Sequence, residues 1–378
     1  MGRAALAVMH DCFVYGALHH AAMLDAVLGR KVDVVAATLH DYVMHHATDI
    51  PTAWAVPRAG GMVNGSVLQG LRELDLARLE FYLTGFGFYA LPLRVQTTQG
   101  VWVTAKTFTS DRNATAGAEW NRTQWLQHHA AEDIATARDF MAHFGVKQPG
   151  AVAARYRQLQ VRGAARLRAA NAPATLRHNC IAADVQIVAR REPYAFFFAV
   201  EEYDLAFRRF DGAPSPQVTR AAFISGDAVT VLPYDPLRDR VLVIEQFRAG
   251  PYARGDAQPW QFEAIAGRID PGETPEAAAR REAEEEAGLA LDSLLPVAQY
   301  YPSPGICAEF LYSYVAITDL PDSAAGVFGV AGEAEDIRGH LLSFDGFMAL
   351  IASGEISTAP LIMTGYWLEK QRAALRAV

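Results

Sequence analysis

The sequence is poor in cysteine and has no long apolar run, and both absences exclude classes of protein. Its cysteines, Cys12, Cys180 and Cys307, lie far apart among 378 residues, and none belongs to a Cys-x-x-Cys pair. This pattern excludes a disulfide framework and a cysteine zinc cage, and it favours a reducing compartment. No segment approaches the roughly 18 consecutive apolar residues of a membrane helix. Because His10 and Asp11 interrupt the apolar start, we expect no signal peptide, a cytoplasmic location and no membrane partner.

The chain as a whole also lacks basic character, but this deficit is confined to its second half. The formal net charge is -8, from 34 Lys and Arg against 42 Asp and Glu. Residues 1–178 hold 18 basic and 13 acidic side chains, a net of +5, whereas residues 179–378 hold 16 and 29, a net of -13. Because an acidic protein is a poor partner for nucleic acid, we expect the arginine-rich segment 155–168 to pack against the acidic half instead. Such a concentration of carboxylates needs a cation or a structural explanation.

In the first part of the chain, short apolar runs alternate with turn signals, which predicts a small mixed α/β domain over residues 1–112. Its predicted strands cover residues 12–15, 63–68, 90–95 and 101–108, and its predicted helices cover residues 21–28 and 71–82. From residue 113, apolar residues recur three or four apart, which indicates two helices with a break at Gly145 and the Pro149-Gly150 pair. We therefore expect a helical connector over residues 113–178.

Strand signals resume after the polar segment 171–179 and predict a second α/β domain over residues 179–378. Its predicted strands are the runs DVQIVA (184–189), YAFFFAV (194–200), AVTVLP (228–233) and RVLVIEQF (240–247). We expect Phe197 and Phe198 of the second run to pack in the core or in a dimer interface rather than against a ligand. A helix is predicted near residues 361–377. The pattern as a whole indicates the α/β (α+β) class.

The segment 267–289, GRIDPGETPEAAARREAEEEAGL, holds the densest group of carboxylates in the sequence. Thr274 followed by Pro275 is typical of a helix N-cap and first turn, and Gly288 is typical of a helix end. We therefore predict one helix over residues 275–287.

Three carboxylates share one face of this predicted helix. Glu282, Glu285 and Glu286 are spaced i, i+3 and i+4, whereas Glu284 points elsewhere. Like charges this close repel one another, so the face either is solvated, with the neighbouring arginines as partial partners, or binds a cation. Oxygen ligands on a rigid helix suit Mg2+ or Mn2+ better than a softer metal.

The spacing of the whole segment fits the pattern G-x5-E-x7-R-E-U-x-E-E-x-G-U, in which U is an aliphatic residue. In this respect it resembles the box motif of the Nudix hydrolases, with Ala283 smaller than the aliphatic residue usual at its position. The resemblance implies an α/β/α sandwich that binds Mg2+ or Mn2+, and it implies that Glu273 and Arg281 orient a loop against the helix. The metal ligands that it implies are Glu282, Glu285, Glu286 and the main-chain carbonyl of Ala266.

The sequence around the box is similar to that of ADP-ribose pyrophosphatases over roughly residues 180–378. The similar segments are GDAVTVLPYDPLRDRVLVIEQFRAGPY (226–252), SPG (303–305) and GEAEDI (332–337). A proline at the position of Pro304 marks a preference for ADP-ribose in that subfamily. The resemblance implies hydrolysis of ADP-ribose to AMP and ribose 5-phosphate by a homodimer. The alternatives are a hydrolase of another nucleoside diphosphate sugar, such as GDP-mannose, or a sensor of ADP-ribose without activity.

The same resemblance implies roles for further residues. Glu333 would be the general base that deprotonates the attacking water, and Glu335 would contribute to metal binding; the alternative for both is a solvated loop. Arg220 and Arg248 would contact the phosphates or the adenosine of the substrate, because guanidinium donates to a diphosphate in a fork. The alternative for each arginine is a surface charge. Glu309 would position the terminal ribose or a metal-bound water.

The N-terminal half carries a second resemblance. The segments FVYGAL (13–18), GGMVNGSVLQGL (60–71) and LARLEFYLTGFGFYALPLRV (76–95) are similar to the γ-glutamylcyclotransferase-like, or AIG2-like, family. The resemblance implies a mixed barrel in which main-chain amides of a loop cradle a glutamyl group and one carboxylate acts as acid and base. The residues that match are Tyr15 and Gly16 in the loop and Glu80 as the carboxylate. The alternative is a degenerate domain that serves as a binding or dimerisation module. The order of the two domains is similar to that in the tellurite-resistance family.

Overall fold

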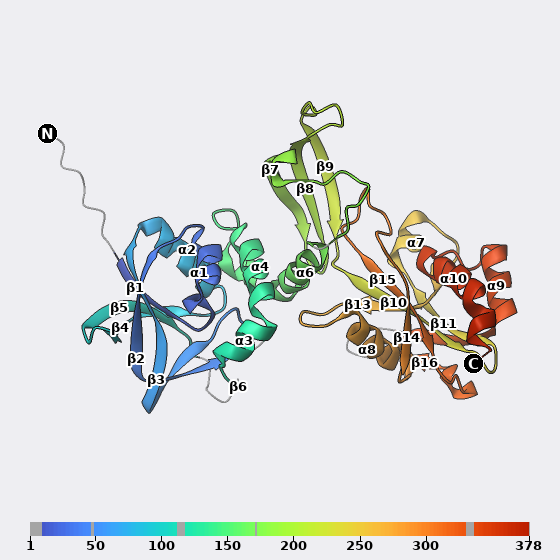
Figure 1. Cartoon of the computed structure of the whole chain (residues 1–378), viewed down its shortest axis with the longest axis horizontal. Coiled ribbons are helices and arrows are strands. Elements are labelled where there is room, and N and C mark those ends of the chain that lie inside the picture. The colour runs from blue at the N-terminus through green and yellow to red at the C-terminus, as the bar shows by residue number, and fades with distance from the viewer. Residues whose placement is uncertain (1–9, 47–48, 112–117, 171, 330–335, 378) are drawn as a thin grey trace. The chain divides into compact units, whose positions relative to one another are not determined.

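The computed structural model describes residues 10–46, 49–111, 118–170, 172–329 and 336–377. These residues fall into two compact units that divide between Leu176 and Arg177, close to the point where the net charge of the sequence changes sign. Each unit has its own sheet (Figure 1). Each also has its own buried apolar clusters. None of the helices within these stretches is both long enough and apolar enough to cross a membrane.

The N-terminal unit contains a sheet that closes on itself. Its strands are β1 (His10–Tyr15), β2 (Asp33–His46), β3 (Trp54–Leu71), β4 (Tyr89–Thr97), β5 (Trp102–Thr109) and β6 (Ala118–Glu119). Their order is β3-β1-β5-β4-β2-β6, and β3 also pairs with β2, so five of the strands form a ring. This confirms the predicted mixed barrel. The sequence pattern missed β2, because partly buried and exposed side chains dominate that strand and leave no clear alternation.

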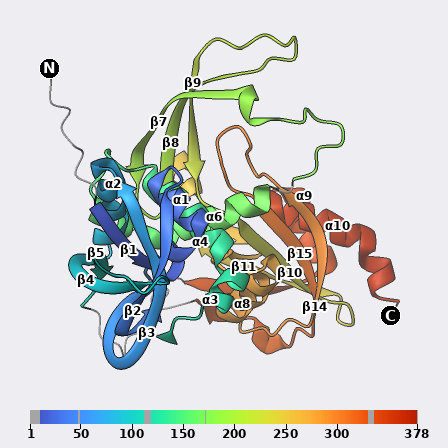
Figure 2. The same cartoon turned by 60° about the vertical axis from the view of Figure 1, so that its left-hand side comes forward.

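Helices pack beside this barrel, as Figure 2 shows for the first two. They are α1 (Ala21–Leu28), α2 (Glu73–Thr84), α3 (Arg122–His128), α4 (Ala130–Met141), α5 (Pro149–Ala153) and α6 (Tyr156–Ala169). Phe140 of α4 and Leu159 of α6 belong to the same buried cluster as Leu28 of α1 and Leu79 of α2. The segment predicted as a connector over residues 113–178 therefore contributes to the core of the N-terminal unit.

The predicted break between two helices lies where expected, between α4 and α5, but each predicted helix is itself divided. The first is interrupted at His129, whose backbone leaves the helical region with φ -127° and ψ -26°. The second is interrupted at Arg155, with φ -114° and ψ 21°. Sequence periodicity did not reveal these interruptions because apolar residues continue at helical spacing across them.

The arginine-rich helix α6 has a partner within its own unit. Arg162 and Arg166 lie 3.3 and 2.7 Å from the carboxylate of Asp139 in α4, which is buried. The expectation that this segment uses the acidic half of the chain is therefore wrong for these two arginines. A buried carboxylate needs a nearby cation, and α6 provides it.

The C-terminal unit is a sandwich around an eight-stranded mixed sheet. Its strands are β10 (Ala228–Asp235), β11 (Arg240–Phe247), β12 (Trp260–Glu263), β13 (Ile265–Arg268), β14 (Ser293–Tyr300), β15 (Leu311–Ile317), β16 (Val327–Phe328) and β17 (Ile337–Ser343). Its helices are α7 (Ala249–Arg254), α8 (Pro275–Ala287), α9 (Phe344–Ser353) and α10 (Ala359–Leu375). The main path of the sheet is β14-β15-β10-β11-β17-β16, with β12 paired to β11 and β13 paired to β10.

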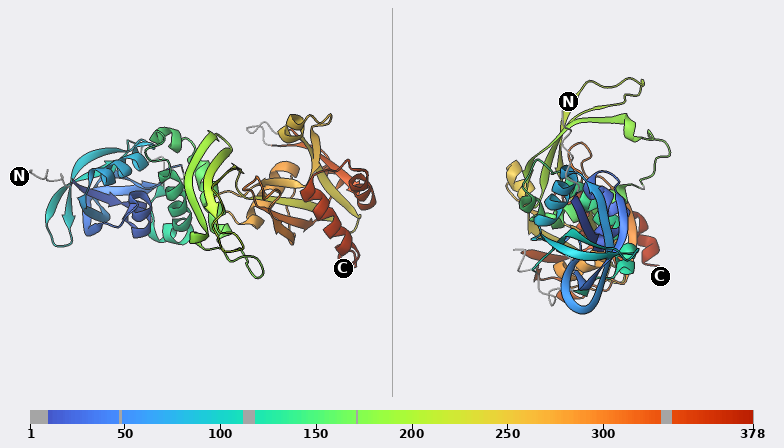
Figure 3. Two further views of the ribbon diagram at one scale, coloured as in Figure 1. Left: turned by 90° about the horizontal axis from the view of Figure 1, so that it is seen from above. Right: turned by 90° about the vertical axis from the view of Figure 1, so that its left-hand side faces the viewer.

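Helices cover both faces of this sheet. Ala279 and Ala283 of α8 pack with Val229 and Ile244 on one face. On the other face, α9 and α10 pack with the alternate residues of the same strands, such as Val243. Figure 1 and Figure 3 show α8 and α10 on opposite sides of β10 and β11. This arrangement confirms the predicted α/β/α sandwich.

A three-stranded antiparallel sheet precedes the sandwich and consists of β7 (Val185–Ala195), β8 (Ala199–Phe207) and β9 (Val218–Ile224). The run YAFFFAV was predicted as one strand, but its phenylalanines form the turn between β7 and β8. The turn is closed by a 2.8 Å hydrogen bond from the Phe196 amide to the carbonyl oxygen of Phe198. Phe197 is 53% exposed, so it does not pack in the core, and its packing in a dimer interface stays a prediction.

Candidate active site

The predicted box helix is α8, and it has the predicted limits. The hydroxyl oxygen of Thr274 accepts a 3.2 Å hydrogen bond from the Ala277 amide, and Pro275 occupies the first turn. Gly288 ends the helix in the left-handed region, at φ 60°, where glycine adopts the conformation with little strain. Both ends depend on local sequence, which is why the sequence pattern located them correctly.

Two carboxylates of α8 lie against the backbone of β13. The Ala266 amide donates to Oε2 of Glu286 at 3.1 Å, and Glu286 is only 3% exposed. Gly267 is next along the strand, and a Cβ atom at this position would overlap the Glu282 carboxylate. The first glycine of the box is therefore required by a close approach of side chain to backbone. These contacts place Glu282 and Glu286 around the Ala266–Gly267 peptide.

Arg281 binds three carboxylates of the box in forked hydrogen bonds. Its Nε and Nη2 donate to the two oxygens of Glu273 at 2.8 and 3.0 Å, and its Nη1 donates to Glu282 at 2.7 Å and to Glu285 at 3.0 Å. Nη2 also donates to the carbonyl oxygen of Arg268 in β13 at 2.9 Å. The hydrogen bonds to Glu273 raise the pKa of Arg281 and outweigh the opposing effect of burial. The guanidinium thus ties the helix, the preceding loop and the strand together.

The residues around Ala266 have the chemistry to hold a divalent cation. Glu282, Glu285 and Glu286 supply carboxylate oxygens and Ala266 supplies a backbone carbonyl, and Mg2+ and Mn2+ prefer such hard ligands. Within the stretches that the structure describes, no three His, Cys, Asp or Glu side chains already have the arrangement of a metal site. The contacts explain this, because Arg281 engages Glu282 and Glu285 while the Ala266 amide engages Glu286.

A second group of charged side chains is coupled to the box. Arg248, the residue before α7, forms an ion pair with Glu263 of β12, with 2.6 Å between Nη2 and Oε2. Burial raises the pKa of Glu309, and the positive charges of Arg268 and Arg248 oppose this rise. The structure therefore brings Arg248 and Arg268, the residue after Gly267, into electrostatic range of Glu309.

Two residues of this group, Glu263 and Arg268, were not identified from the sequence. A charged residue within the otherwise apolar run WQFEAIAG was a signal for Glu263. Nothing in the sequence distinguished Arg268 from a surface arginine, because the residue that it packs against lies about seventy positions away.

Three other predicted residues are not brought to the box by described contacts. Arg220 lies on β9, is exposed, and donates to the carbonyl oxygen of Thr219 at 2.9 Å. Glu333 and Glu335 fall within residues 330–335, which lie outside the described residues. The roles of all three stay predictions.

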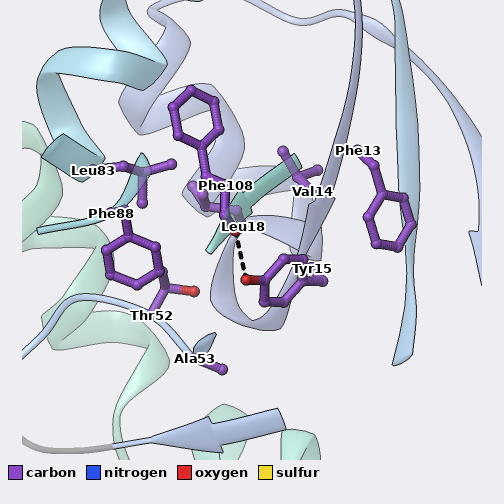
Figure 4. A pocket seen from close by; sticks show the side chains of 9 residues that line it. All are labelled: Phe13, Val14, Tyr15, Leu18, Thr52, Ala53, Leu83, Phe88 and Phe108. Carbon is purple, nitrogen blue, oxygen red and sulfur yellow. Dashed lines mark hydrogen bonds between the residues drawn. The ribbon is translucent and has the colours of Figure 1, made fainter. Parts of the chain in front are cut away.

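In the N-terminal unit, Tyr15 and Gly16 lie beside a small, mainly apolar pocket (Figure 4). It is lined by Phe13, Val14, Tyr15, Leu18, Thr52, Ala53, Leu83, Phe88 and Phe108. The Tyr15 hydroxyl donates to the carbonyl oxygen of Phe108 at 2.6 Å and accepts from the Ala55 amide at 3.0 Å, and burial raises the pKa of this tyrosine.

The loop that follows Tyr15 is also bonded within the protein. The Ala17 amide donates to the hydroxyl oxygen of Thr52 at 3.2 Å. Gly16 has a φ of 60°, and a Cβ atom there would come within 2.9 Å of the same oxygen. One of the amides expected to cradle a ligand is therefore already engaged.

Glu80 is not among the residues that line this pocket. It lies on α2, its side chain is 44% exposed, and its Oε1 is 2.9 Å from Nζ of Lys106. The neighbouring Phe81 is buried and packs edge-on against Phe140 and Phe144. The structure therefore does not place the predicted acid/base carboxylate in the pocket beside Tyr15 and Gly16.

Taken together, a sandwich fold and a carboxylate helix on a glycine-containing strand define a Nudix-type hydrolase domain. The family model described as NUDIX domain matches residues 225–354. The family model described as Gamma-glutamyl cyclotransferase, AIG2-like, matches residues 12–127. The chain belongs to the Nudix family, and an AIG2-like domain precedes its hydrolase domain.

Curated relatives match the C-terminal part of the chain over most of their own length. The ADP-ribose pyrophosphatase of Escherichia coli (strain K12) is 38% identical over 206 residues, which are 54% of this chain and 96% of that enzyme. The ADP-ribose pyrophosphatase of Haemophilus influenzae is 32% identical over 51% of this chain and 89% of that enzyme. The GDP-mannose pyrophosphatase of Yersinia pestis (strain Pestoides F) is 32% identical over 44% of this chain and 82% of that enzyme. A crystal structure titled ADP compounds hydrolase covers 50% of this chain and 96% of its own, with 22% identity and a TM-score of 0.39.

Proposed function

We propose that the C-terminal unit hydrolyses the diphosphate of a nucleoside diphosphate sugar, with ADP-ribose as substrate and AMP and ribose 5-phosphate as products. The observation that carries this proposal is the placement of Glu282 and Glu286 around the Ala266–Gly267 peptide. Relatives named ADP-ribose pyrophosphatase support the choice of substrate. A sensor of ADP-ribose without activity would have no need for this complete set of oriented carboxylates.

In this proposal Glu282, Glu285, Glu286 and the carbonyl of Ala266 hold Mg2+, or Mn2+ in its place. The bound cation neutralises the charge that builds on the phosphoryl oxygens. Arg281 keeps the carboxylates oriented through its forked bonds. Glu333 deprotonates the attacking water, and Glu335 adds a metal ligand.

Substrate recognition in this proposal uses the second group of charged side chains. The Arg248 guanidinium donates paired hydrogen bonds to the diphosphate. The diphosphate therefore competes with Glu263 for this guanidinium. Glu309 accepts hydrogen bonds from the hydroxyls of the terminal ribose. Partial burial raises the pKa of Glu309. The positive charges of Arg268 and Arg248 oppose this rise and favour the carboxylate form, which accepts hydrogen bonds.

The test is release of AMP from ADP-ribose in the presence of Mg2+, and its loss on chelation. Glu286→Gln removes a metal ligand and is expected to lower kcat by at least about a hundredfold. The matched control is Glu284→Gln, because Glu284 is exposed on the same helix and faces away from β13. Undiminished turnover by Glu286→Gln would reject the assignment of the site.

A relative named GDP-mannose pyrophosphatase supports the second candidate, hydrolysis of that sugar nucleotide. The two candidates share the box and differ in the base that is bound. A panel of ADP-ribose, GDP-mannose and ADP-glucose under the same conditions separates them by kcat/KM. A larger kcat/KM for GDP-mannose than for ADP-ribose would replace the substrate while leaving the proposed chemistry intact.

We also propose a homodimer that forms through the sheet β7-β8-β9. This sheet and the turn between β7 and β8 expose several large apolar side chains, which a second copy of the chain would remove from water. They include Ile187, Val188, Tyr194, Phe197 and Phe207. Because Arg220 lies on the same sheet, a dimer could bring it to the site of a second copy. Light scattering of the wild type and of Val188→Glu tests the proposal, and a monomeric wild type would reject it.

For the N-terminal unit, the contacts favour a binding or dimerisation module over catalysis. Glu80 is paired with Lys106 outside the pocket, and the polar groups of Tyr15 and Ala17 are bonded internally. Incubation with γ-glutamyl amines is therefore expected to yield no 5-oxoproline while ADP-ribose is still hydrolysed. Production of 5-oxoproline would instead support a bifunctional enzyme.

A further inference from the structure

Three arginines lie around the box, and they differ in the carboxylates that they bind. Arg281 is engaged by Glu273 and by two glutamates of α8. Arg248 is engaged by Glu263. Arg268, by contrast, has no carboxylate within ion-pair distance among the residues that the structure describes, and Asp270 and Glu309 act on it only at longer range.

The backbone of Arg268 is fixed next to the proposed metal ligands. It follows Gly267, whose missing side chain makes room for the Glu282 carboxylate. Its carbonyl oxygen accepts a 2.9 Å hydrogen bond from Arg281. The Arg268 side chain lies within electrostatic range of Glu309, the carboxylate that the proposed function places at the terminal ribose of the substrate, so its charge acts on what this part of the site binds.

The side chain of Arg268 is held in place by aromatic rings. Its guanidinium carbon lies 3.9 Å from the ring centre of Phe197 and 5.4 Å from that of Phe198, in the turn between β7 and β8. Phe198 is itself held by Phe223 of β9, with ring centres 4.9 Å apart. Stacking on rings orients a guanidinium without neutralising it.

Among the residues that the structure describes, few groups bind the donors of this guanidinium. Of its N–H groups, one makes a long hydrogen bond of 3.5 Å to the carbonyl oxygen of Phe197. The Arg268 side chain is partly buried, so its guanidinium is less hydrated than that of a fully exposed arginine. A cation that has lost water and has no counter-ion gains more than an exposed cation does when an anion binds.

We propose that Arg268 is a substrate-binding residue that donates to the diphosphate of the substrate while stacked on Phe197. This inference rests on the proposed function and adds to it a residue that binds the diphosphate, the group that reacts. The diphosphate is the anion that the reaction brings to the box, and the planar fork of a guanidinium matches its oxygens. Arg268 then complements the cation held by the glutamates, from the side of the three-stranded sheet.

The first experiment compares steady-state hydrolysis by the wild type, Arg268→Gln and Arg268→Lys. Loss of a charge-assisted hydrogen bond to the diphosphate is expected to raise KM by roughly tenfold or more in Arg268→Gln, with a smaller change in kcat. Arg268→Lys is expected to recover part of the affinity, because it keeps the charge but loses the fork. The control is Arg254→Gln, because Arg254 is an exposed arginine that pairs with its neighbour Asp256.

The second experiment measures binding of inorganic pyrophosphate with Mg2+ by calorimetry, and it does not depend on turnover. The wild type is expected to bind about tenfold more tightly than Arg268→Gln, and Arg254→Gln as tightly as the wild type. If no nucleotide sugar is hydrolysed but this difference is found, the proposed function fails and the inference about Arg268 stands. If Arg268→Gln keeps both KM and pyrophosphate affinity, or if the wild type binds no pyrophosphate, the inference is overturned.

A double-mutant cycle with Phe197→Leu tests the stacking. If Phe197 serves to hold Arg268, then Phe197→Leu has little further effect on pyrophosphate affinity once Arg268 is Gln. Additive losses of affinity would show that the two residues act independently and would remove the stack from the proposal.

Discussion

The two candidate sites of this chain differ in how their polar groups are held. In the Nudix box, Arg281 binds Glu282 and Glu285, and the amide of Ala266 binds Glu286, so three carboxylates are held in fixed orientations. In the N-terminal pocket, the hydroxyl of Tyr15 both donates and accepts, and the amide of Ala17 is bonded to Thr52. A catalytic site needs polar groups in fixed orientations, and the box holds three carboxylates in this way, whereas the residues that line the pocket are neutral.

The surroundings of the key carboxylates differ in the same way. Glu286 lies on the buried face of α8 and accepts a hydrogen bond from the backbone of β13, so packing sets its position. Glu80 is partly exposed and paired with a flexible lysine. Exposed pairs of this kind contribute little to stability and little to orientation. The comparison supports the proposal that the C-terminal unit carries the chemistry and that the N-terminal unit is a binding or dimerisation module. Four substitutions test this contrast.

The largest effect is expected from Gly267→Ala. The new Cβ atom would overlap the Glu282 carboxylate and displace it from the Ala266–Gly267 peptide. We expect kcat for ADP-ribose to fall by about a hundredfold or more, because displacement of a catalytic group by even about 1 Å is costly. Gly250→Ala is the control, since a Cβ atom at Gly250 meets no atom within 4 Å. Activity retained by Gly267→Ala would show that Glu282 need not lie against this strand.

A somewhat smaller effect is expected from Arg281→Lys. Lysine keeps the charge but cannot make the forked bonds to Glu273, Glu282 and Glu285. We expect kcat to fall by about tenfold and the free energy of unfolding of the C-terminal unit to fall by about 2 kcal/mol. Arg280→Lys is the matched control on the neighbouring position, where the side chain is exposed. Equal behaviour of the two variants would contradict the organising role of Arg281.

The third prediction concerns the N-terminal unit and its stability. Burial raises the pKa of Asp133 to about 7, although this carboxyl accepts a 2.6 Å hydrogen bond from the indole nitrogen of Trp125. Since the folded state holds the proton more tightly than the unfolded state, the stabilisation is complete below about pH 4 and is lost as pH rises to about 7. Asp133→Asn keeps the acceptor and removes the titration. It should therefore be more stable than the wild type above pH 7, by about 4 kcal/mol.

Urea unfolding followed by tryptophan fluorescence at pH 5 and pH 8 measures this difference. Asp33→Asn serves as the control, because Asp33 is exposed at the start of β2. An advantage of Asp133→Asn that is the same at both pH values would rule out titration of Asp133 as its cause.

The smallest effect is expected from Glu80→Gln, which removes the pair with Lys106. A partly exposed ion pair contributes less than about 1 kcal/mol, so thermal unfolding should shift by only a few degrees at most. Hydrolysis of ADP-ribose should not change. If the wild type does form 5-oxoproline and Glu80→Gln abolishes it, the contrast between the two units is lost.

The sequence predicted the parts of the fold that depend on local chemistry. Thr274, Pro275 and Gly288 set the ends of α8 at the predicted residues. The runs at 228–233 and 240–247 became β10 and β11, because continuous apolar residues suit strands buried on both faces. Prediction failed where long-range packing decided the outcome, as in the turn at Phe197 and the interruption of a helix at His129.

By itself, the sequence determined that Glu282, Glu285 and Glu286 share one helix face, because the period of an α-helix follows from backbone geometry alone. Only the tertiary structure decided which of them lie against β13, which arginine orients them, and that Arg268 stacks on a ring about seventy residues away. It also decided that Glu80 faces Lys106 rather than the pocket beside Tyr15. The reason is physical: caps and periodicity act over a few residues, whereas burial and ion pairing depend on segments that only folding brings together.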